Sequence, residues 1–364
     1  MPFVYLFVLT YGLLALYVMS SFKFSFVPDK IDYPKQVSIV IPFRNEAKKL
    51  SACIQSIREQ EGIEAEVILV DDHSEDASDS VAEVASHGLD AKIMLSRGHG
   101  KKAALLTGIN SASYNLIYTT DADCILSQGT IKSMLKHVHY KQLNMLCGLV
   151  QLESKGSVFE DFQQAESAAL VGLSAIFLNQ ERPATCNGAN LMFRRDVFSQ
   201  IGGYGAQALT SSGDDDLLMQ RFAQLDTTKV AFHALPGFKV HTGAEPGINS
   251  FIHQRARWAS KHSKYLYPYN TVLLVMMVSR IPFYFFLAIL TGLFWSAWFY
   301  LPLALLLCAD LGMALYIRRW LNFKLYTVFL MPVYQLYIPV VWLKSKLGKT
   351  NWKDREISIS KEKI

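Results

Sequence analysis

Charged residues are scarce in this sequence, and its first segment has none. Of the 364 residues, 18% are charged and 51% are hydrophobic. That balance leaves too little polar surface for an ordinary soluble protein, unless the apolar residues are segregated into membrane spans. No charged side chain occurs in residues 1–22. A helix of this length can cross a hydrocarbon core of roughly 30 Å, which predicts an N-terminal transmembrane anchor over residues 1–22.

A cleaved signal peptide is the alternative for this first segment. Such a peptide needs a positive n-region and a small-residue cleavage site, and the segment has neither. Lys23, Lys30 and Lys35 follow the segment, and no basic residue precedes it. The positive-inside rule therefore places the N-terminus outside and the next domain in the cytoplasm.

Cysteines are few and lack paired spacing. The five cysteines are Cys53, Cys124, Cys147, Cys186 and Cys308, with no C-x-x-C pair. Their odd number and scatter argue against a disulfide framework and against a structural zinc site. The basic residues, with a net charge of +5, gather near apolar segments and form no stripe interleaved with aromatics. This pattern favours anionic lipid headgroups over nucleic acid as a partner.

Residues 36–265 have the composition of a soluble domain, and the first half alternates short apolar runs with helix-length polar stretches. The predicted strands are 37–41, 67–70, 92–95 and 116–119, and the predicted helices are 46–60, 75–86 and 101–111. This βαβ rhythm predicts an α/β fold with a doubly wound, mostly parallel sheet. In such sheets, ligands bind beyond the carboxyl ends of the strands.

Residues 266–343 are predicted to form interfacial and transmembrane helices. Residues 281–317 contain a single acid, Asp310, and are long enough for a tight pair of helices, while 325–343 offer a third. The last segment, 344–364, is a basic tail. A third full crossing would place this tail outside. Either 325–343 are re-entrant or interfacial, or the positive-inside rule fails here.

Two carboxylates follow the predicted strand 116–119 directly. Asp121 and Asp123 would project from one strand end into the ligand crevice. Mg²⁺ prefers oxygen ligands and is usually held by one or two carboxylates together with substrate phosphates. An ion at this place would neutralise charge on a departing diphosphate. The alternative is a turn made of helix-capping aspartates.

A second acidic cluster consists of Asp214, Asp215 and Asp216. Three adjacent carboxylates repel one another, which raises the pKa of at least one and favours a role as a base. The alternative is an N-cap with an acidic first turn for a helix over 217–224. Both interpretations can hold, with different aspartates serving each.

A basic and aromatic motif precedes the membrane-grade sequence. Gln254, Arg257 and Trp258 have helical spacing that puts them on one face. The indole can stack on a sugar, and the planar donors of the other two can bind a diphosphate. The alternative is an amphipathic interface helix with Trp258 at the headgroups and Arg255, Arg257 and Lys261 facing lipid phosphate.

These motifs occur in a recognisable order. They are residues 37–46, 70–76, 100–102, the D-x-D motif at 121–123, residues 213–215 and the Q-x-x-R-W motif at 254–258. Together they resemble the inverting family 2 glycosyltransferases of GT-A fold, in particular the membrane-embedded branch that includes cellulose and hyaluronan synthases. The resemblance covers about residues 36–260. It implies a multi-pass protein of the cell membrane with a cytoplasmic GT-A domain.

The resemblance also implies roles by position. The implied nucleotide-binding residues are Pro42, Arg44, Glu46, Asp72, Lys101 and Asp121. It implies a Mg²⁺ or Mn²⁺ ion at Asp123, and it implies that Asp215, as the base, and Asp214 are the catalytic residues. The implied acceptor and diphosphate contacts are Gly188, Gln254, Arg257 and Trp258. For Lys101 and Lys102 the alternative is an exposed first helical turn, and for the loop 185–190 it is a plain turn.

The expected reaction transfers a sugar from a nucleotide-diphosphate sugar, preferably a UDP-sugar, to a hydroxyl of a lipid-linked or glycan acceptor. About three C-terminal helices favour a single transfer to a membrane lipid over a processive polysaccharide synthase. A transporter or scaffold that only binds nucleotide is the alternative of another class. It would need polar residues in its spans, and only Arg280, Asp310 and Gln335 are candidates.

Overall fold

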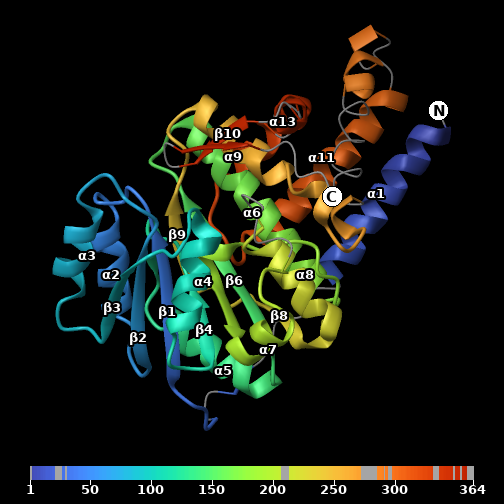
Figure 1. Cartoon of the computed structure of the whole chain (residues 1–364). Helices are drawn as coiled ribbons and strands as arrows, with labels where there is room; N and C mark the ends of the chain where they lie inside the picture. The colour runs from blue at the N-terminus through green and yellow to red at the C-terminus, as the bar shows by residue number, and fades with distance from the viewer. Residues whose placement is uncertain are drawn as a thin grey trace.

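The computed structural model describes residues 2–20, 27–28, 31–205, 213–271, 285–290, 292–293, 297–330, 336–346, 349–352 and 355–358. Most of these residues form an α/β domain, from which two apolar helices project (Figure 1).

The first half of the domain is a parallel sheet with the strand order β3-β2-β1-β4. The strands are β1 (Gln36–Phe43), β2 (Glu64–Asp71), β3 (Ala91–Leu95) and β4 (Leu116–Thr119). The connecting helices are α2 (Leu50–Arg58), α3 (Ser78–Ser86) and α4 (Lys101–Ser111). All seven predicted elements are confirmed, and the bounds of β4 and α4 match the prediction to the residue.

The second half adds strands of both directions. They are β5 (Ile125–Leu126), β6 (Met145–Glu153), β7 (Leu191–Arg194), β8 (Val230–His233) and β9 (Lys239–Gly243). β7 lies antiparallel between β4 and β6, whereas β6 pairs with β8 and β9 in parallel. Parallel pairings outnumber antiparallel ones among the described strands, as predicted, but the sheet is mixed.

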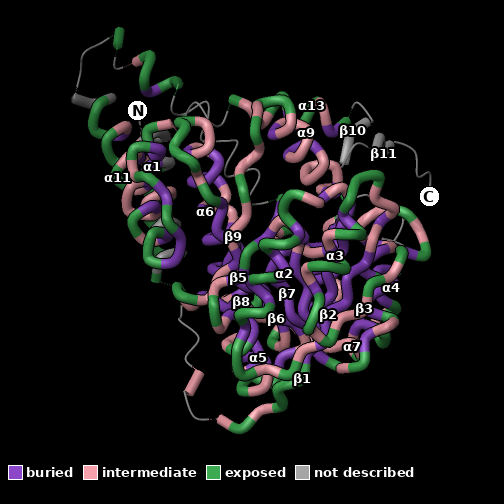
Figure 2. Tube along the Cα trace, turned by 90° about the vertical axis from the view of Figure 1, so that its left-hand side faces the viewer, coloured by how far each residue is buried: buried purple, intermediate pink, exposed green. Residues whose placement is uncertain are grey.

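Helices cover both faces of this sheet, which produces two apolar cores (Figure 2). One core lies under α2, α3 and α5 (Thr130–Lys141). The other lies under α4, α6 (Val158–Leu178), α7 (Arg195–Gln200) and α8 (Asp216–Leu225). The alternation along β1 explains the division, because Ile39 and Ile41 point to the first core and Val40 points to the second. The prediction of a doubly wound sheet is therefore confirmed.

The segment 325–343 is not one α-helix. It begins with the 3₁₀ helix η5 (Leu325–Leu330), and α13 (Tyr337–Lys346) follows after residues that lie outside the described ones. α13 packs along α9 (Ile248–Ala259), where the rings of Tyr337 and Phe251 are 5.2 Å apart. This packing favours the interfacial interpretation over a third crossing. In the basic tail, β10 (Lys349–Trp352) and β11 (Arg355–Ser358) form a hairpin.

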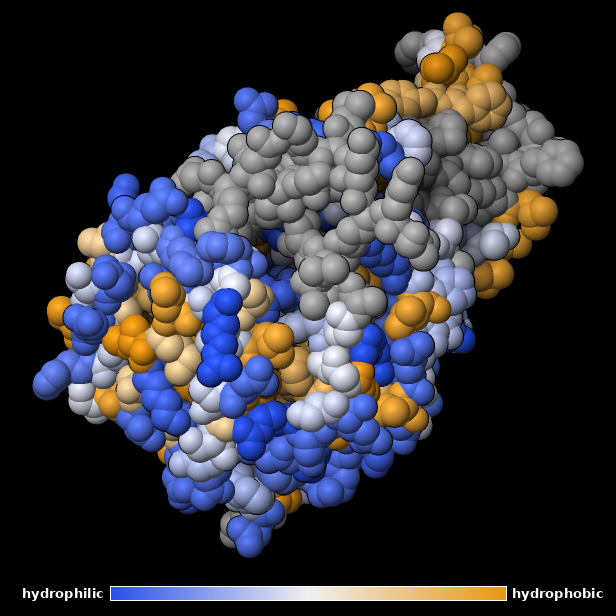
Figure 3. Space-filling view, viewed as in Figure 1, coloured by the Kyte–Doolittle hydropathy of each residue, from blue (hydrophilic) through white to orange (hydrophobic). Residues whose placement is uncertain are grey.

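The two projecting helices are α1 (Pro2–Ser20) and α11 (Ala297–Ile317), which lie side by side. Apolar side chains gather on this end of the molecule, whereas hydrophilic ones predominate over the α/β domain (Figure 3). Among the described helices, one stretch, Tyr300–Ile317, is long and apolar enough to cross a membrane. The N-terminal anchor and a multi-pass topology stay predictions, and part of the predicted pair over 281–317 lies outside the described residues.

The polar candidates for a transport path are only partly described. The Tyr11 hydroxyl donates a hydrogen bond to Asp310 Oδ1 at 2.7 Å, so Asp310 joins α1 to α11. Arg280 and Gln335 lie outside the described residues.

Candidate active site

The donor side of the site lies where β1 and β2 end. Pro42, Arg44, Glu46 and Asp72 meet there, and all four are buried. The guanidinium of Arg44 donates to the backbone oxygens of Asp72, at 3.0 Å, and His73, and it forms an ion pair with Glu75 at 2.6 Å. Arg44 therefore positions the loop after β2, and the direct nucleotide contact that the resemblance implies stays a prediction.

Backbone donors hold the carboxylates of this loop. Asp72 is completely buried, and its Oδ1 accepts a hydrogen bond from the Gly100 N–H at 2.8 Å. Asp71 Oδ1 accepts from the Ser74 N–H at 2.8 Å. The Glu46 N–H donates to Ser78 Oγ at 2.8 Å. These bonds join the loops after β1, β2 and β3 into one edge.

Lys101 connects this edge with the acidic clusters. Its Nζ lies 2.7 Å from Asp121 Oδ1 and 2.8 Å from Asp214 Oδ2. Desolvation disfavours the charged amine, but the two carboxylates outweigh desolvation and raise the pKa of Lys101. The alternative of an exposed first turn is wrong, because the Lys101 side chain is 22% exposed and Lys102 is buried. Burial lowers the pKa of Lys102 to about 8.

The D-x-D carboxylates remain accessible. The side chains of Asp121 and Asp123 are 33% and 28% exposed, and their oxygens lie within 4.8 Å of each other and of Cys124 Sγ. Burial raises the pKa of the Cys124 thiol well above its usual range, so this thiol stays protonated. The accessible donors are therefore oxygens, which fits a hard divalent cation. The helix-capping alternative is wrong, because α5 begins after Gly129 and not at these aspartates.

In the second cluster, Asp215 is the N-cap of α8. Its Oδ1 accepts from the Asp216 N–H at 2.7 Å, which confirms the capping interpretation. Lys261 Nζ lies 3.1 Å from Asp215 Oδ1 and 2.9 Å from Asp216 Oδ1, and the Tyr265 hydroxyl donates to Asp216 Oδ2 at 2.6 Å. One buried lysine therefore compensates two adjacent carboxylates.

The pKa values of these neighbours move in opposite directions. Desolvation acts on both, but Lys261 and the capping hydrogen bonds hold the pKa of Asp215 well below its usual range. Burial raises the pKa of Asp216 to about 7, with the charge of Asp215 adding to the effect. The predicted rise in pKa therefore falls on Asp216, which is 1% exposed, and not on Asp215.

Gly188 begins a short 3₁₀ helix, Gly188–Asn190, beside the acids. A Cβ atom at this position would lie 3.2 Å from Asp214 Oδ2 and 3.5 Å from Lys101 Nζ. The Asn187 side chain caps the turn by accepting from the Ala189 N–H at 3.0 Å. The backbone therefore approaches the ion pair closely, as glycine permits.

The Q-x-x-R-W motif lies on α9, whose C-terminal end leads to Lys261. Gln254 donates to Glu245 Oε1 at 2.6 Å, and the ring of Trp258 packs 4.3 Å from the Arg255 guanidinium. Within the part of the chain that the structure describes, the Arg257 guanidinium has no hydrogen-bond or ion-pair partner. Arg257 therefore keeps donors for an anionic ligand.

The lipid-facing alternative is wrong for Arg255 and Lys261, because both are buried. Arg255 Nε donates to both carboxylate oxygens of Glu166, at 2.9 and 3.0 Å, and Tyr337 donates to Glu166 Oε1 at 2.6 Å. Glu166, Arg255, Lys261 and Tyr265 were not predicted as site residues. One sequence signal could have identified Lys261, because three adjacent aspartates require a nearby cation.

The comparisons with known proteins agree with this geometry. The family model described as glycosyl transferase family 2 matches residues 38–202. The undecaprenyl-phosphate 4-deoxy-4-formamido-L-arabinose transferases of Salmonella paratyphi B and Salmonella newport are each 38% identical over 95 residues, which are 24% of this chain and 29% of theirs. The chain thus spans less than a third of the length of these curated relatives.

A solved structure resembles nearly the whole chain. The mannosyltransferase PcManGT from Pyrobaculum calidifontis, in complex with GDP-Man and Mn²⁺, superposes with a TM-score of 0.58 at 18% identity, over 94% of this chain and 99% of that chain. This likeness shows the fold, an α/β arrangement of GT-A type with a mixed sheet. Residues 38–202 are thus similar to family 2 glycosyltransferases, and the chain shares its fold with a solved glycosyltransferase structure.

Proposed function

We propose that this protein transfers a sugar from a nucleotide-diphosphate sugar to a hydroxyl on a membrane lipid or lipid-linked acceptor, with inversion at the sugar carbon. The contact that carries the proposal is made by Lys101, which bridges Asp121 and Asp214. This contact brings the D-x-D motif and the second acidic cluster, far apart in the chain, to one site. Such a site can face a diphosphate on one side and an acceptor on the other.

The donor side has the chemistry that a diphosphate requires. Asp121 and Asp123 would hold Mg²⁺ or Mn²⁺, which supplies positive charge opposite the departing diphosphate. Lys101 can exchange a carboxylate partner for a phosphate oxygen, since both are anionic acceptors. Arg257, with its available donors, is the second cation that we assign to the phosphates. The fixed loop at Asp72 would bind the base or ribose.

Asp215 is the proposed base. It would accept the proton of the acceptor hydroxyl while the acceptor oxygen bonds to the sugar carbon and the bond to the diphosphate oxygen breaks. The nucleoside diphosphate then leaves. The side chain of Asp215 is 19% exposed, so an acceptor can reach it, and its lowered pKa keeps it ionised at neutral pH. Trp258 would close the acceptor side.

The same lowered pKa supports a second candidate, transfer to a lipid phosphate. General bases work best when their pKa lies near the operating pH, and that of Asp215 lies far below it. A phosphate acceptor is already ionised and needs no base. The names of the curated relatives, undecaprenyl-phosphate transferases, agree with such an acceptor.

One experiment tests the reaction and separates the acceptors. Membranes containing the protein are incubated with radiolabelled sugar nucleotides, after chelation and with Mg²⁺ or Mn²⁺ restored. We expect lipid-extractable label that depends on the ion. With a hydroxyl acceptor, Asp215→Asn should reduce transfer about 10²- to 10⁴-fold. With a phosphate acceptor, the loss should stay below about tenfold.

The matched control is Asp196→Asn. Asp196 is an exposed acid in the first turn of α7, so it shares the helix-terminal position of Asp215 but not its site. Its substitution should leave transfer unchanged. The glycosyltransferase proposal fails if the intact protein neither transfers sugar from any of the sugar nucleotides nor hydrolyses any of them.

A further inference from the structure

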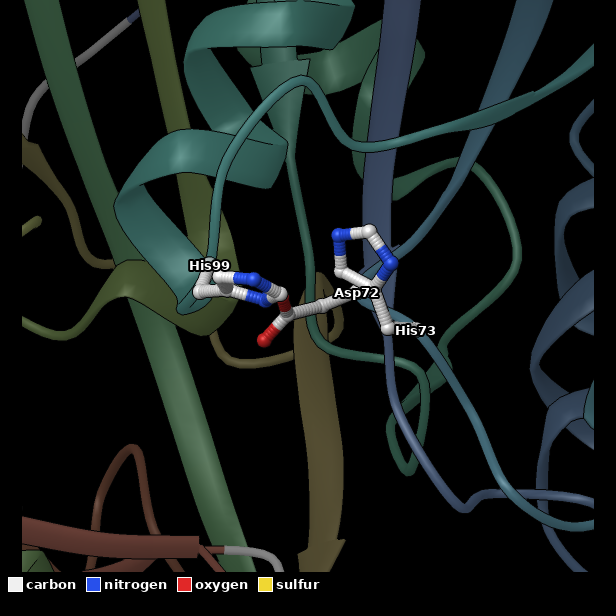
Figure 4. Close-up of side chains that lie close together, drawn as sticks. All are labelled: Asp72, His73 and His99. Atoms are coloured by element: carbon white, nitrogen blue, oxygen red, sulfur yellow. The ribbon is translucent and has the colours of Figure 1, made fainter.

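A second group of potential metal ligands lies at the donor edge, separate from the D-x-D carboxylates. Asp72, His73 and His99 each offer one ligand atom, and these atoms lie within 4.8 Å of one another. Figure 4 shows the Asp72 carboxylate close to the His99 ring, with the His73 ring nearby. The ring centroids are 4.4 Å apart. His99 comes from the loop before α4, and the other two residues directly follow β2.

The donor set distinguishes this group from the proposed Mg²⁺ or Mn²⁺ site. Two imidazole nitrogens and one carboxylate oxygen suit Zn²⁺ and the neighbouring transition ions. Mg²⁺ prefers oxygen ligands throughout. Three protein ligands also leave a fourth tetrahedral position for water. The group therefore matches an open zinc site in ligand type and number.

The supporting contacts are of the kind that orient metal ligands. His73 Nε2 lies 3.3 Å from the Gly98 carbonyl oxygen, which favours a proton on Nε2 and leaves the Nδ1 lone pair for a metal. Asp72 is held by the Gly100 N–H and, at its backbone, by Arg44. Two of the three ligands are thus fixed before any ion arrives.

The third ligand can move to complete the site. Zn²⁺ bonds of about 2.0–2.2 Å place tetrahedral ligand atoms about 3.3 Å apart, somewhat closer than the present upper limit of 4.8 Å. His99 is exposed and lies between Gly98 and Gly100. Gly100 has a φ of +92°, a conformation that glycine adopts without strain. A modest shift of this loop would close the gap.

We propose that Asp72, His73 and His99 bind Zn²⁺ or a similar transition ion, and that the bound ion weakens nucleotide binding. The second half of this inference rests on the proposed function, in which Asp72 contacts the nucleotide. The loop also leads directly from His99 through Gly100 to Lys101, which faces the diphosphate in that proposal. An ion bound to His99 would hold the loop from His99 to Lys101 against Asp72. It would also occupy the Asp72 carboxylate.

The first test uses metal alone. Full-length protein without a histidine tag is titrated with CoCl₂ in detergent, and the visible absorption of tetrahedral cobalt is followed. We expect a band that saturates at one ion per chain and disappears when ZnCl₂ is added. His99→Gln and His73→Gln should each weaken Co²⁺ binding by about 10- to 100-fold. Thermal melting checks that the variants fold, which the exposed position of His99 favours.

Two control variants separate this site from other histidines and from the D-x-D motif. His87→Gln removes an exposed histidine outside the group and should leave the cobalt band unchanged. Asp123→Asn removes an oxygen of the proposed Mg²⁺ or Mn²⁺ site and should also leave it unchanged. The zinc site is refuted if no band forms, or if His99→Gln binds Co²⁺ as tightly as the unchanged protein.

The second test measures UDP and GDP binding by calorimetry with and without ZnCl₂. Zinc should weaken binding at least about tenfold in the unchanged protein, and His99→Gln should abolish that effect. A saturated cobalt band with unaltered nucleotide affinity overturns the inhibitory half. Because the cobalt titration needs no donor or acceptor, it decides the metal site even if the protein transfers no sugar.

Discussion

The acids that directly follow β2 in the donor half and the buried acids of the acceptor half are held in different ways. In the donor half, residues 36–126, the acids after β2 accept hydrogen bonds from backbone N–H groups, as Asp71 does from Ser74 and Asp72 from Gly100. In the acceptor half, residues 158–265, buried acids are paired with cations: Lys261 holds Asp215 and Asp216, and Arg255 holds Glu166.

This difference has a physical consequence. A backbone donor fixes the position of a carboxylate without a second charged side chain, so the acids after β2 are in place before a ligand binds. A buried ion pair is stable only while both charges are present, because removing one leaves the other without compensation in a low dielectric. The buried pairs of the acceptor half should therefore respond more strongly to substitution, and to the charge of a substrate, than the acids that follow β2.

The largest effect should come from breaking the pair between Arg255 and Glu166. Arg255→Met removes the cation from Glu166, which is 1% exposed and also accepts a hydrogen bond from the Tyr337 hydroxyl. We expect the free energy of unfolding to fall by about 3–5 kcal/mol, measured by thermal melting in detergent. The double variant with Glu166→Gln should regain part of this loss.

The donor half supplies the matched comparison. Asp71→Asn keeps an oxygen that can accept the hydrogen bond from the Ser74 N–H. The substitution should therefore lower the free energy of unfolding by less than about 1 kcal/mol. Equal losses for Asp71→Asn and Arg255→Met would contradict the distinction between the two halves.

A pH titration should reveal the next largest effect, at a buried histidine pair that joins α5 to β8. His137 Nδ1 lies 2.9 Å from His233 Nδ1, so one ring must accept a hydrogen bond and stay neutral. Burial lowers the pKa of His137 to about 4 and that of His233 to about 3. At these two histidines the unfolded chain binds more protons below pH 6.5, so their contribution to stability should fall as the pH drops from about 6.5 towards 4.

The expected loss is about 3 kcal/mol for each histidine. Melting temperatures across this range measure it. His233→Gln should remove roughly half of the pH dependence, whereas exposed His87→Gln should leave it unchanged. A pH dependence that is the same in His233→Gln as in the unchanged protein would disprove the neutral pair, because the raised pKa of Asp216 acts in both proteins alike.

The sequence predicted the donor half well, because its information is local. The bounds of β4 and α4 follow from an apolar run and the polar residues that end it. Parallel strands end at a common edge, so the meeting of the loops after β1, β2 and β4 could be inferred before any contact was seen.

The acceptor half could be predicted only in part, because its contacts are between distant residues. The spacing of Gln254, Arg257 and Trp258 predicts a helix face but not what the face contacts. In the sequence, Arg255 and Lys261 resemble interfacial cations. In the structure they pair with buried acids on α6 and α8. The short strand β7 likewise gains its antiparallel place from partners in β4 and β6.

A smaller effect should follow from filling the space where the two halves meet. In Gly188→Ala, the new methyl group would lie 3.2 Å from Asp214 Oδ2 and 3.5 Å from Lys101 Nζ. We expect transfer to fall about 10- to 100-fold through misplacement of the ion pair, with stability changing by less than about 1 kcal/mol. Gly237→Ala has no atom within 4 Å of its new methyl group and should change neither quantity. A melting temperature that falls in step with activity would assign the effect to folding.

The smallest effect should come from the exposed pair between Lys49 and Asp123, whose N···O distance is 3.3 Å and whose side chains are 54% and 28% exposed. Water screens this pair, so Lys49→Ala should cost about 0.5 kcal/mol or less. Removal of the positive charge should tighten Mn²⁺ binding about threefold at low salt and leave it unchanged at high salt. Lys48→Ala removes the same charge one residue away and should have a weaker influence. A stability loss near that of Arg255→Met would mean that an exposed pair contributes as much as a buried one, which would contradict screening of this pair by water.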